Sequence, residues 1–294
     1  MQSALRMLEV TKVYEHFQLD KLSFALPAGE IMGLVGVNGA GKSTIIRILM
    51  GLIQADAGDV EVLGYKVPQQ QVLAKSEVGF ASEDMRLYKT KDLEWHMHFV
   101  QSIFPAWDDT YARHLLKKFD LKSDQKIAGF SHGQRVKATL LLLLARRPAL
   151  LILDEPTTGL DPVARSEVID ELAEVLADEN RSVLFSSHNT HDVEQLSDSI
   201  TFLHDGRLLA SENIESFLNS WRCIRCIGNV DIASVQLPGL ADVRRHGSLV
   251  SLKVERFDES LLGTLRSQGL EIVEVLPMNL EEIFIANVKK GRKQ

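Results

Sequence analysis

The feature that most constrains this 294-residue chain is a glycine-rich segment between an apolar stretch, 31–35, and a helix-like stretch, 45–50. It matches the pattern G-x-x-x-x-G-K-[ST] and runs Gly36, Val37, Asn38, Gly39, Ala40, Gly41, Lys42, Ser43, Thr44. Such a backbone curls so that successive N–H groups point at phosphate oxygens, and the following helix directs its positive end there. Lys42 is predicted to reach the β- and γ-phosphates of a nucleotide, and Ser43 to offer its hydroxyl to Mg²⁺.

A second motif consists of two acids directly after an apolar strand. Residues 150–153 are Leu-Leu-Ile-Leu, and Asp154 and Glu155 follow them. Asp154 is predicted to hold Mg²⁺ through its coordination shell, and Glu155 to polarise an attacking water. Taken by itself the segment could equally be a loop with exposed acids. The phosphate loop upstream favours the catalytic interpretation.

The order of the remaining segments predicts an α/β fold. We expect strands at 5–10, 22–26, 60–62, 78–81, 183–186 and 200–203, and a helix beginning at Asp161-Pro162. From about 88 to 147, apolar residues recur at helical spacing, which predicts a helical insertion. The predicted core is a P-loop NTPase domain, 1–218, with a mostly parallel sheet and a helical subdomain at about 88–147.

The last part of the chain, 219–294, has a different pattern. Residues 248–254 alternate as a half-buried strand does, 272–275 form a second strand candidate, and Asn279 with Glu282 forms a capping box that opens a helix. We expect a small C-terminal α+β accessory domain here. Cys223 and Cys226 in this region could suggest metal or redox chemistry, but zinc usually takes four ligands.

Composition narrows the class of protein. A net charge of −7 and a pI of about 5.7 argue against a nucleic-acid binder, which needs basic patches. Two cysteines in a chain of this length favour a reducing cytosol. The start of the chain shows no signal-peptide pattern, and the longest apolar run, about 138–145, is far shorter than the ~20 residues of a membrane-spanning helix. A role at a membrane would therefore require a partner.

Further motifs carry a resemblance to a family. Phe130-Ser131-His132-Gly133-Gln134 precedes a leucine-rich helix and is similar to the signature motif of ATP-binding cassettes. Gly159-Leu160-Asp161-Pro162 resembles the D-loop, and Ser187-His188 resembles the segment with the switch histidine. The resemblance covers residues 4–215. It identifies the chain as similar to the ATP-binding subunits of ABC transporters.

That resemblance implies a shared active site. Two cassettes face each other head to tail, and each ATP lies between the phosphate loop of one and the signature of the other. The resemblance implies catalytic roles for Glu155, His188 and Glu83, and Mg²⁺ ligation by Ser43, Asp154 and Glu83. The nucleotide-binding residues it implies, with Tyr14 stacking on adenine, are Tyr14, Gly36, Asn38, Gly39, Ala40, Gly41, Lys42, Ser43, Thr44, Ser131, Gly133 and Gln134.

Two positions depart from the family pattern. His132 stands where the signature usually has glycine, so a side chain must fit beside the nucleotide or contribute a donor. Glu83 stands where the family usually has the glutamine of the Q-loop, and its carboxylate adds negative charge near phosphates. Glu83 could also be only a loop acid.

The implied function is an ATPase subunit that dimerises, with a second copy or a related cassette, and powers a separate membrane permease. The implied location is cytoplasmic, at the inner face of the membrane. Segments 278–284 and 104–108 resemble bacterial export-type cassettes. The aromatic residues between Tyr88 and Trp107 could be core or could line a groove for the permease. Alternatives are a soluble ABC protein without a transport role, and a regulatory cassette that binds ATP without turnover.

Overall fold

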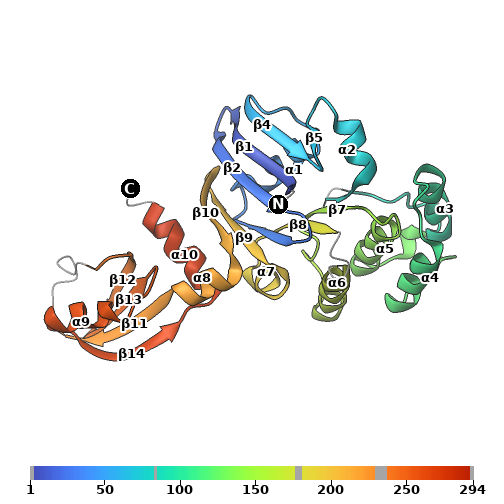
Figure 1. Ribbon diagram of the computed structural model, residues 1–294. Coiled ribbons are helices and arrows are strands. Elements are labelled where there is room, and N and C mark those ends of the chain that lie inside the picture. The colour runs from blue at the N-terminus through green and yellow to red at the C-terminus, as the bar shows by residue number, and fades with distance from the viewer. Residues whose placement is uncertain (1–2, 83–84, 176–180, 229–236, 292–294) are drawn as a thin grey trace. The chain divides into compact units, whose positions relative to one another are not determined.

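The computed structural model describes residues 3–82, 85–175, 181–228 and 237–291 (Figure 1). Its strands are β1 Ser3–Tyr14, β2 Phe17–Pro27, β3 Ile31–Val35, β4 Ala57–Val62, β5 Tyr65–Lys66, β6 Val78–Ala81, β7 Leu150–Asp154, β8 Ser182–Ser187, β9 Ser199–His204, β10 Arg207–Asn213, β11 Arg222–Ile227, β12 Leu240–His246, β13 Leu249–Val254 and β14 Glu271–Pro277. Its helices are α1 Lys42–Leu49, α2 Gln71–Glu77, α3 Leu93–Ile103, α4 Asp109–Lys118, the 3-10 turn η1 Ile127–Gly129, α5 His132–Leu144, α6 Pro162–Val175, α7 Thr190–Leu196, α8 Ile214–Ser220, α9 Ser260–Ser267 and α10 Leu280–Gly291.

The chain divides into two compact units, Met1–Leu208 and Leu209–Gln294. The division falls inside β10, earlier in the chain than the boundary expected after residue 218.

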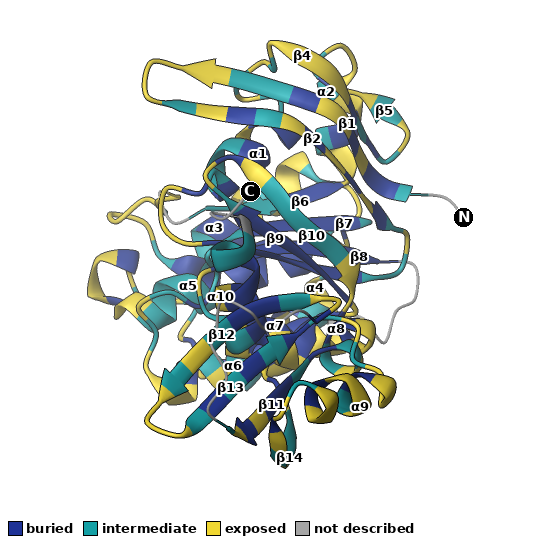
Figure 2. Cartoon of the chain, turned by 90° about the vertical axis from the view of Figure 1, so that its left-hand side faces the viewer, coloured by how far each residue is buried: buried dark blue, intermediate teal, exposed yellow. Residues whose placement is uncertain are grey.

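A six-stranded sheet forms the centre of the first unit, in the order β10-β9-β3-β8-β7-β6. The ladders that join β9, β3, β8, β7 and β6 are all parallel. Nearly every residue of β3, β7, β8 and β9 is buried, as Figure 2 shows for β7, β8 and β9. This explains why these strands are continuous apolar runs, since a parallel sheet is covered on both faces. The predicted mostly parallel α/β core is confirmed.

A second sheet in this unit is antiparallel, with the order β2-β1-β4-β5. The sequence predicted strands within β1, β2 and β4 but not that they form a separate sheet. Their apolar residues alternate in burial and join the core around α1, as Leu5, Leu26 and Ile45 show. One face of this sheet therefore covers the helix that follows the phosphate loop.

The helices α3, α4 and α5 lie within the range 88–147. α3 and α4 begin with aspartate caps, Asp92 and Asp108, whose carboxylates accept from backbone N–H groups three residues later. α5 packs against both of them and against β6. Its start is thereby held at a fixed place relative to the sheet edge.

The second unit contains a sheet in the order β12-β13-β11-β14 and helices α8, α9 and α10. Its core includes Ile224, Cys226, Leu252 and Leu265. The predicted capping box is present, because Asn279 Oδ1 accepts from Glu282 N at 2.9 Å and Asn279 N donates to the Glu282 carboxylate at 3.4 Å. α10 therefore begins with the capping box that the sequence predicted.

The two cysteines of the second unit are free and buried. Burial raises the pKa of Cys226 to about 11, with a smaller contribution from Cys223, so its thiol stays protonated and unreactive at neutral pH. Within the described part of the chain, no group of three or more His, Cys, Asp or Glu side chains is placed to hold a metal ion. No described helix has the length and apolar character needed to span a bilayer.

Candidate nucleotide-binding and catalytic site

The phosphate loop connects β3 to α1, as the sequence predicted. Its tight path depends on two glycines. A Cβ on Gly36 would lie 2.6 Å from the carbonyl oxygen of Leu203, and Gly41 has a φ of 111° with Phe17 and Leu19 packed against it. Larger residues would force the loop open at these points. The loop therefore keeps the shape in which its residues and the start of α1 line one cavity.

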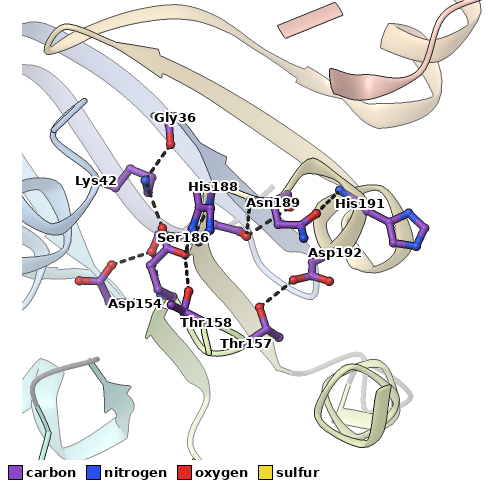
Figure 3. Close-up of polar contacts among 12 residues, drawn as sticks. Gly36, Lys42, Asp154, Thr157, Thr158, Ser186, His188, Asn189, His191 and Asp192 are labelled. Carbon is purple, nitrogen blue, oxygen red and sulfur yellow. Dashed lines mark hydrogen bonds and ion pairs between the residues drawn. The ribbon is translucent and has the colours of Figure 1, made fainter. Parts of the chain in front are cut away.

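Lys42 occupies the first position of α1 and is 6% exposed. Its ammonium donates to the carbonyl oxygen of Gly36 at 2.7 Å and lies 3.1 Å from Glu155 Oε1 (Figure 3). A buried ammonium needs such partners, because burying an unpaired charge is costly. These contacts hold the amine where a phosphate on the loop can meet it.

Glu155 contacts two other predicted site residues, Lys42 and His188. Its Oε2 lies 2.7 Å from His188 Nδ1 and accepts from Thr158 Oγ1 at 2.9 Å, while Oε1 faces Lys42. Burial alone would raise the pKa of Glu155, but the charge of Lys42 and the hydrogen bonds from His188, Lys42 and Thr158 outweigh it and hold the pKa below its usual value. The carboxylate is therefore ionised at neutral pH.

The backbone of Glu155 is also unusual. Its φ is 54°, a left-handed conformation that L-residues with a Cβ rarely adopt. Its N–H donates to Ser186 Oγ at 3.0 Å. Residues held in this region often lie at functional sites, where the surrounding structure stabilises them. Here the turn directs the carboxylate toward the phosphate loop rather than along β7.

Asp154 ends β7 beside Glu155. Its Oδ1 accepts from Ser186 Oγ at 2.6 Å, so Ser186 of β8 holds both acids in place (Figure 3). Sequence reasoning missed Ser186. The role of Ser186 follows only from the pairing of β7 with β8, in which Asp154 lies opposite Ser186.

A cavity of about 370 Å³ contains most of the predicted phosphate-binding residues. From the sequence prediction it brings together Asn38, Gly39, Ala40, Gly41, Lys42, Ser43, Thr44, Glu155 and His188. Three further lining residues, Phe17, Val37 and Thr158, were not predicted as site residues. Gly36 does not itself line the cavity. Its carbonyl oxygen accepts a hydrogen bond from the ammonium of Lys42, which does.

Tyr14, predicted to stack on adenine, is not among the residues that line this cavity. It is 44% exposed, with the Lys12 ammonium over its ring, and its ring centre is 6.4 Å from that of Phe17. Phe17 lines the cavity and packs on Gly41. The aromatic ring at the mouth of the cavity is therefore that of Phe17, three residues further along the chain.

The signature residues lie elsewhere. Ser131 caps α5, Gln134 N donates to Ser131 Oγ at 3.1 Å, and Ser131 N donates to Gln134 Oε1 at 2.9 Å. Gly133 faces α6, where an added Cβ would lie 3.3 Å from that of Ala164. None of these residues lines the phosphate-loop cavity. Glu83, the remaining predicted site residue, lies outside the described residues.

The residues around the loop fit a magnesium nucleotide. Ser43 lines the cavity and offers a hydroxyl, and Asp154, which precedes Glu155 but does not itself line this cavity, offers a carboxylate. Oxygen ligands of this kind are those that Mg²⁺ prefers. The buried ammonium of Lys42 and the start of α1 offer positive charge to phosphates.

Comparison with known proteins agrees with this geometry. A family model described as ABC transporter matches residues 19–158. A Nod factor export ATP-binding protein I from Neorhizobium galegae is 30% identical over 299 residues, covering 96% of this chain and 84% of that protein. The chain belongs to the ATP-binding subunits of ABC transporters.

Further relatives of this ABC ATPase include the ABC transporter ATP-binding protein YtrB of Bacillus subtilis. It is 28% identical over 291 residues, covering 98% of this chain and 99% of that protein. A solved structure of an ATP-binding subunit of an ABC transporter covers 74% of this chain and 92% of its own, with 27% identity and a TM-score of 0.67. The recognition of the family from its ordered motifs is confirmed.

Proposed function

We propose that this ABC subunit binds ATP with Mg²⁺ in the phosphate-loop cavity and hydrolyses it with Glu155, as one of two cassettes that drive a separate membrane permease. The observation that carries the proposal is the convergence of Lys42, Glu155 and His188 on one cavity. We assign these steps to residues 1–218 and an accessory role to 219–294.

Binding of ATP would use the backbone first. Residues of the loop and of the start of α1 line the cavity, and their backbone N–H groups would surround the β- and γ-phosphates. Lys42 would exchange its contact with Glu155 for one with phosphate, while Gly36 continues to orient the amine. Ser43 and Asp154 would hold Mg²⁺, which would neutralise charge at the phosphates.

Hydrolysis would then depend on Glu155. Its carboxylate is ionised and fixed by hydrogen bonds, so it can accept a hydrogen bond from a water and orient that water for attack. His188 is half-exposed at the cavity and holds Glu155 from one side, which leaves its other ring nitrogen to face the γ-phosphate. Phosphoryl transfer needs this positioning more than covalent chemistry.

A second cassette would complete the site. The capped start of α5 presents Ser131, whose hydroxyl and free helix N–H groups suit an anion, outside this chain's own cavity. In the proposed head-to-tail pair, Ser131 and Gly133 of each copy meet the γ-phosphate bound by the other. A second copy of this chain is the simplest such partner.

An aromatic surface of α3 supports a permease contact. The rings of Trp95 and Phe99 stack with their centres 5.2 Å apart, and the ring of Tyr88 meets that of Trp95 edge-on with centres 5.7 Å apart. Tyr88, Phe99 and Ile103 are 63%, 45% and 53% exposed, so this group extends beyond the core. Exposed apolar patches of this kind commonly mark protein interfaces. We propose that a permease segment covers it, which would place the subunit at the cytoplasmic face of the membrane.

We further propose that transport is outward. The support is the similarity to proteins named for Nod factor export, together with the export-type character of residues 278–284 and 104–108.

The test is steady-state ATPase activity of the chain with its co-expressed permease, comparing wild type with Glu155→Gln. The amide keeps the size of the carboxylate but accepts protons far less readily. Wild type should hydrolyse ATP, and Glu155→Gln should fall by about 100-fold or more while still binding ATP. Equal rates in the two proteins would refute the role of Glu155. Absence of hydrolysis in both would favour a regulatory cassette.

A further inference from the structure

His132 makes a contact that neither the phosphate-loop cavity nor the signature motif explains. It is the first residue of α5, and its Nε2 lies 3.1 Å from the carbonyl oxygen of Thr158. A carbonyl oxygen only accepts, so Nε2 carries the hydrogen and donates. Gly159 follows with a φ of 73°, and a Cβ there would lie 3.2 Å from Nε2. Glycine at 159 therefore leaves the space that the imidazole ring occupies.

The same threonine reaches the catalytic carboxylate. Thr158 Oγ1 donates to Glu155 Oε2 at 2.9 Å, and Thr158 N donates to the carbonyl oxygen of Glu155 at 3.2 Å. His132, Thr158 and Glu155 also line one cavity of about 400 Å³, and Thr158 and Glu155 line the phosphate-loop cavity as well. Contacts within a single chain thus run from the start of α5 to the carboxylate.

These contacts connect the start of α5 to Glu155, and in the proposed dimer the two act on different nucleotides. Ser131 and Gly133 flank His132 and, in the proposed dimer, meet the ATP held by the partner. Glu155 acts on the ATP held by its own chain. A displacement of the start of α5 would move the Thr158 carbonyl, and with it the hydroxyl that fixes Glu155.

We propose that His132 is a positioning residue that couples the signature end of α5 to Glu155 of the same chain through Thr158. It thereby makes hydrolysis at one nucleotide sensitive to engagement of the other. The inference rests on the proposed function, since it requires the two-cassette site.

A competing role for His132 is direct contact with the nucleotide of the partner. The Nε2 donor of His132 is directed at the carbonyl oxygen of Thr158 in its own chain. The two roles differ in the chain on which they act. Positioning affects the Glu155 of the chain that carries His132, whereas direct contact affects the site of the other chain.

The first experiment compares His132→Gln with His132→Met in the full chain with its permease. Glutamine can place an amide N–H near the position of Nε2, while methionine has similar length and no donor. His132→Met should lower kcat about fivefold with little change in KM, and the Hill coefficient for ATP should fall toward one. His132→Gln should restore most of both. Equal losses in the two variants, or no loss in His132→Met, would overturn the proposal.

The second experiment uses mixed dimers with two affinity tags, in which one chain carries Glu155→Gln and only the other can hydrolyse ATP. His132→Met is placed on the hydrolysing chain or on the Glu155→Gln chain. The proposal predicts that the first placement costs about fivefold more activity than the second. The reverse order would establish direct nucleotide contact and overturn it.

Two controls distinguish loss of folding, failure of the proposed function and failure of the proposed role of His132. Thermal unfolding of each variant identifies loss of folding, and the comparison within mixed dimers holds the composition constant. Absence of hydrolysis from dimers of two wild-type chains would refute the proposed function itself. Active wild-type dimers with equal effects of both placements would refute only the role of His132.

Discussion

The phosphate-loop cavity and the first turn of α5 are both formed by motifs visible in the sequence, but the residues of the two motifs make different contacts in the fold. In the cavity, Glu155 already contacts both Lys42 and His188 within a single chain. At the first turn of α5, Ser131 and Gln134 contact each other, and neither lines the cavity. The difference is what the proposed two-cassette site requires, because one chain then supplies the phosphate loop with Glu155 and the other chain supplies the start of α5.

The largest expected effect is on nucleotide binding by Lys42→Ala. The lysine is buried and charged, and charge-assisted hydrogen bonds are among the strongest contacts a phosphate can receive. The affinity of the isolated chain for ATP should fall by about 100-fold. Calorimetric titration measures this, with Lys122→Ala, an exposed lysine, as the matched control. Equal losses in the two variants would remove Lys42 from the site.

Ser131 should behave in the opposite way in a single chain. Ser131→Asp and Ser131→Asn both keep a side chain that can cap α5, so the thermal stability of both should stay near that of wild type. Neither should alter ATP binding by one chain. In the Glu155→Gln background, Ser131→Asp should weaken ATP-dependent dimerisation about tenfold more than Ser131→Asn, because its charge meets a phosphate. Sedimentation measures the association, and equal dimerisation would argue against the shared site.

A smaller effect separates two aromatic residues. Phe17 lines the cavity, whereas Tyr14 does not. Phe17→Ala should weaken ATP binding about tenfold through loss of stacking, and Tyr14→Ala should have a clearly smaller effect. Binding of a fluorescent ATP analogue to each variant measures this. A larger loss in Tyr14→Ala would support the predicted stacking of Tyr14 on adenine.

The smallest effect concerns pH. The pKa of Glu155 is lowered in the folded chain, so the unfolded chain takes up its proton first as the pH falls. Its contribution to stability is present above the ordinary glutamate pKa and is lost as the pH falls through the lowered one. Without nucleotide, the Tm of wild type should fall by about 1–3 °C more than that of Glu155→Gln between pH 6 and pH 3.5. Parallel curves in differential scanning fluorimetry would contradict this.

Local signals in the sequence were sufficient for much of the fold and the site. The phosphate loop, the acids after β7 and the cap at Asn279 each depend on residues close together in the chain. Their spacing along the sequence is therefore enough to predict the local structure. β3 and β6 were predicted with the bounds they have, because buried strands are short apolar runs that end at polar residues.

The remaining features depend on contacts between distant segments. Phe17 reaches the cavity only because β2 pairs with β1 and packs on Gly41. Ser186 supports Asp154 and Glu155 only through the β7–β8 ladder, and His132 meets Thr158 across α5 and the loop before α6. No spacing along the chain encodes such pairs. The place of Glu83 stays a prediction.

Complementation between two disabled chains tests the shared site most directly. Lys42→Ala and Ser131→Asp are expressed separately and together with the permease, and ATPase activity is measured on purified mixed dimers. A shared site places both defects on one nucleotide and leaves the other site intact, so the mixed dimers should be clearly more active than either variant alone. Mixed dimers no more active than the mean of the two parents would show that each chain works with its own signature, and would contradict the account.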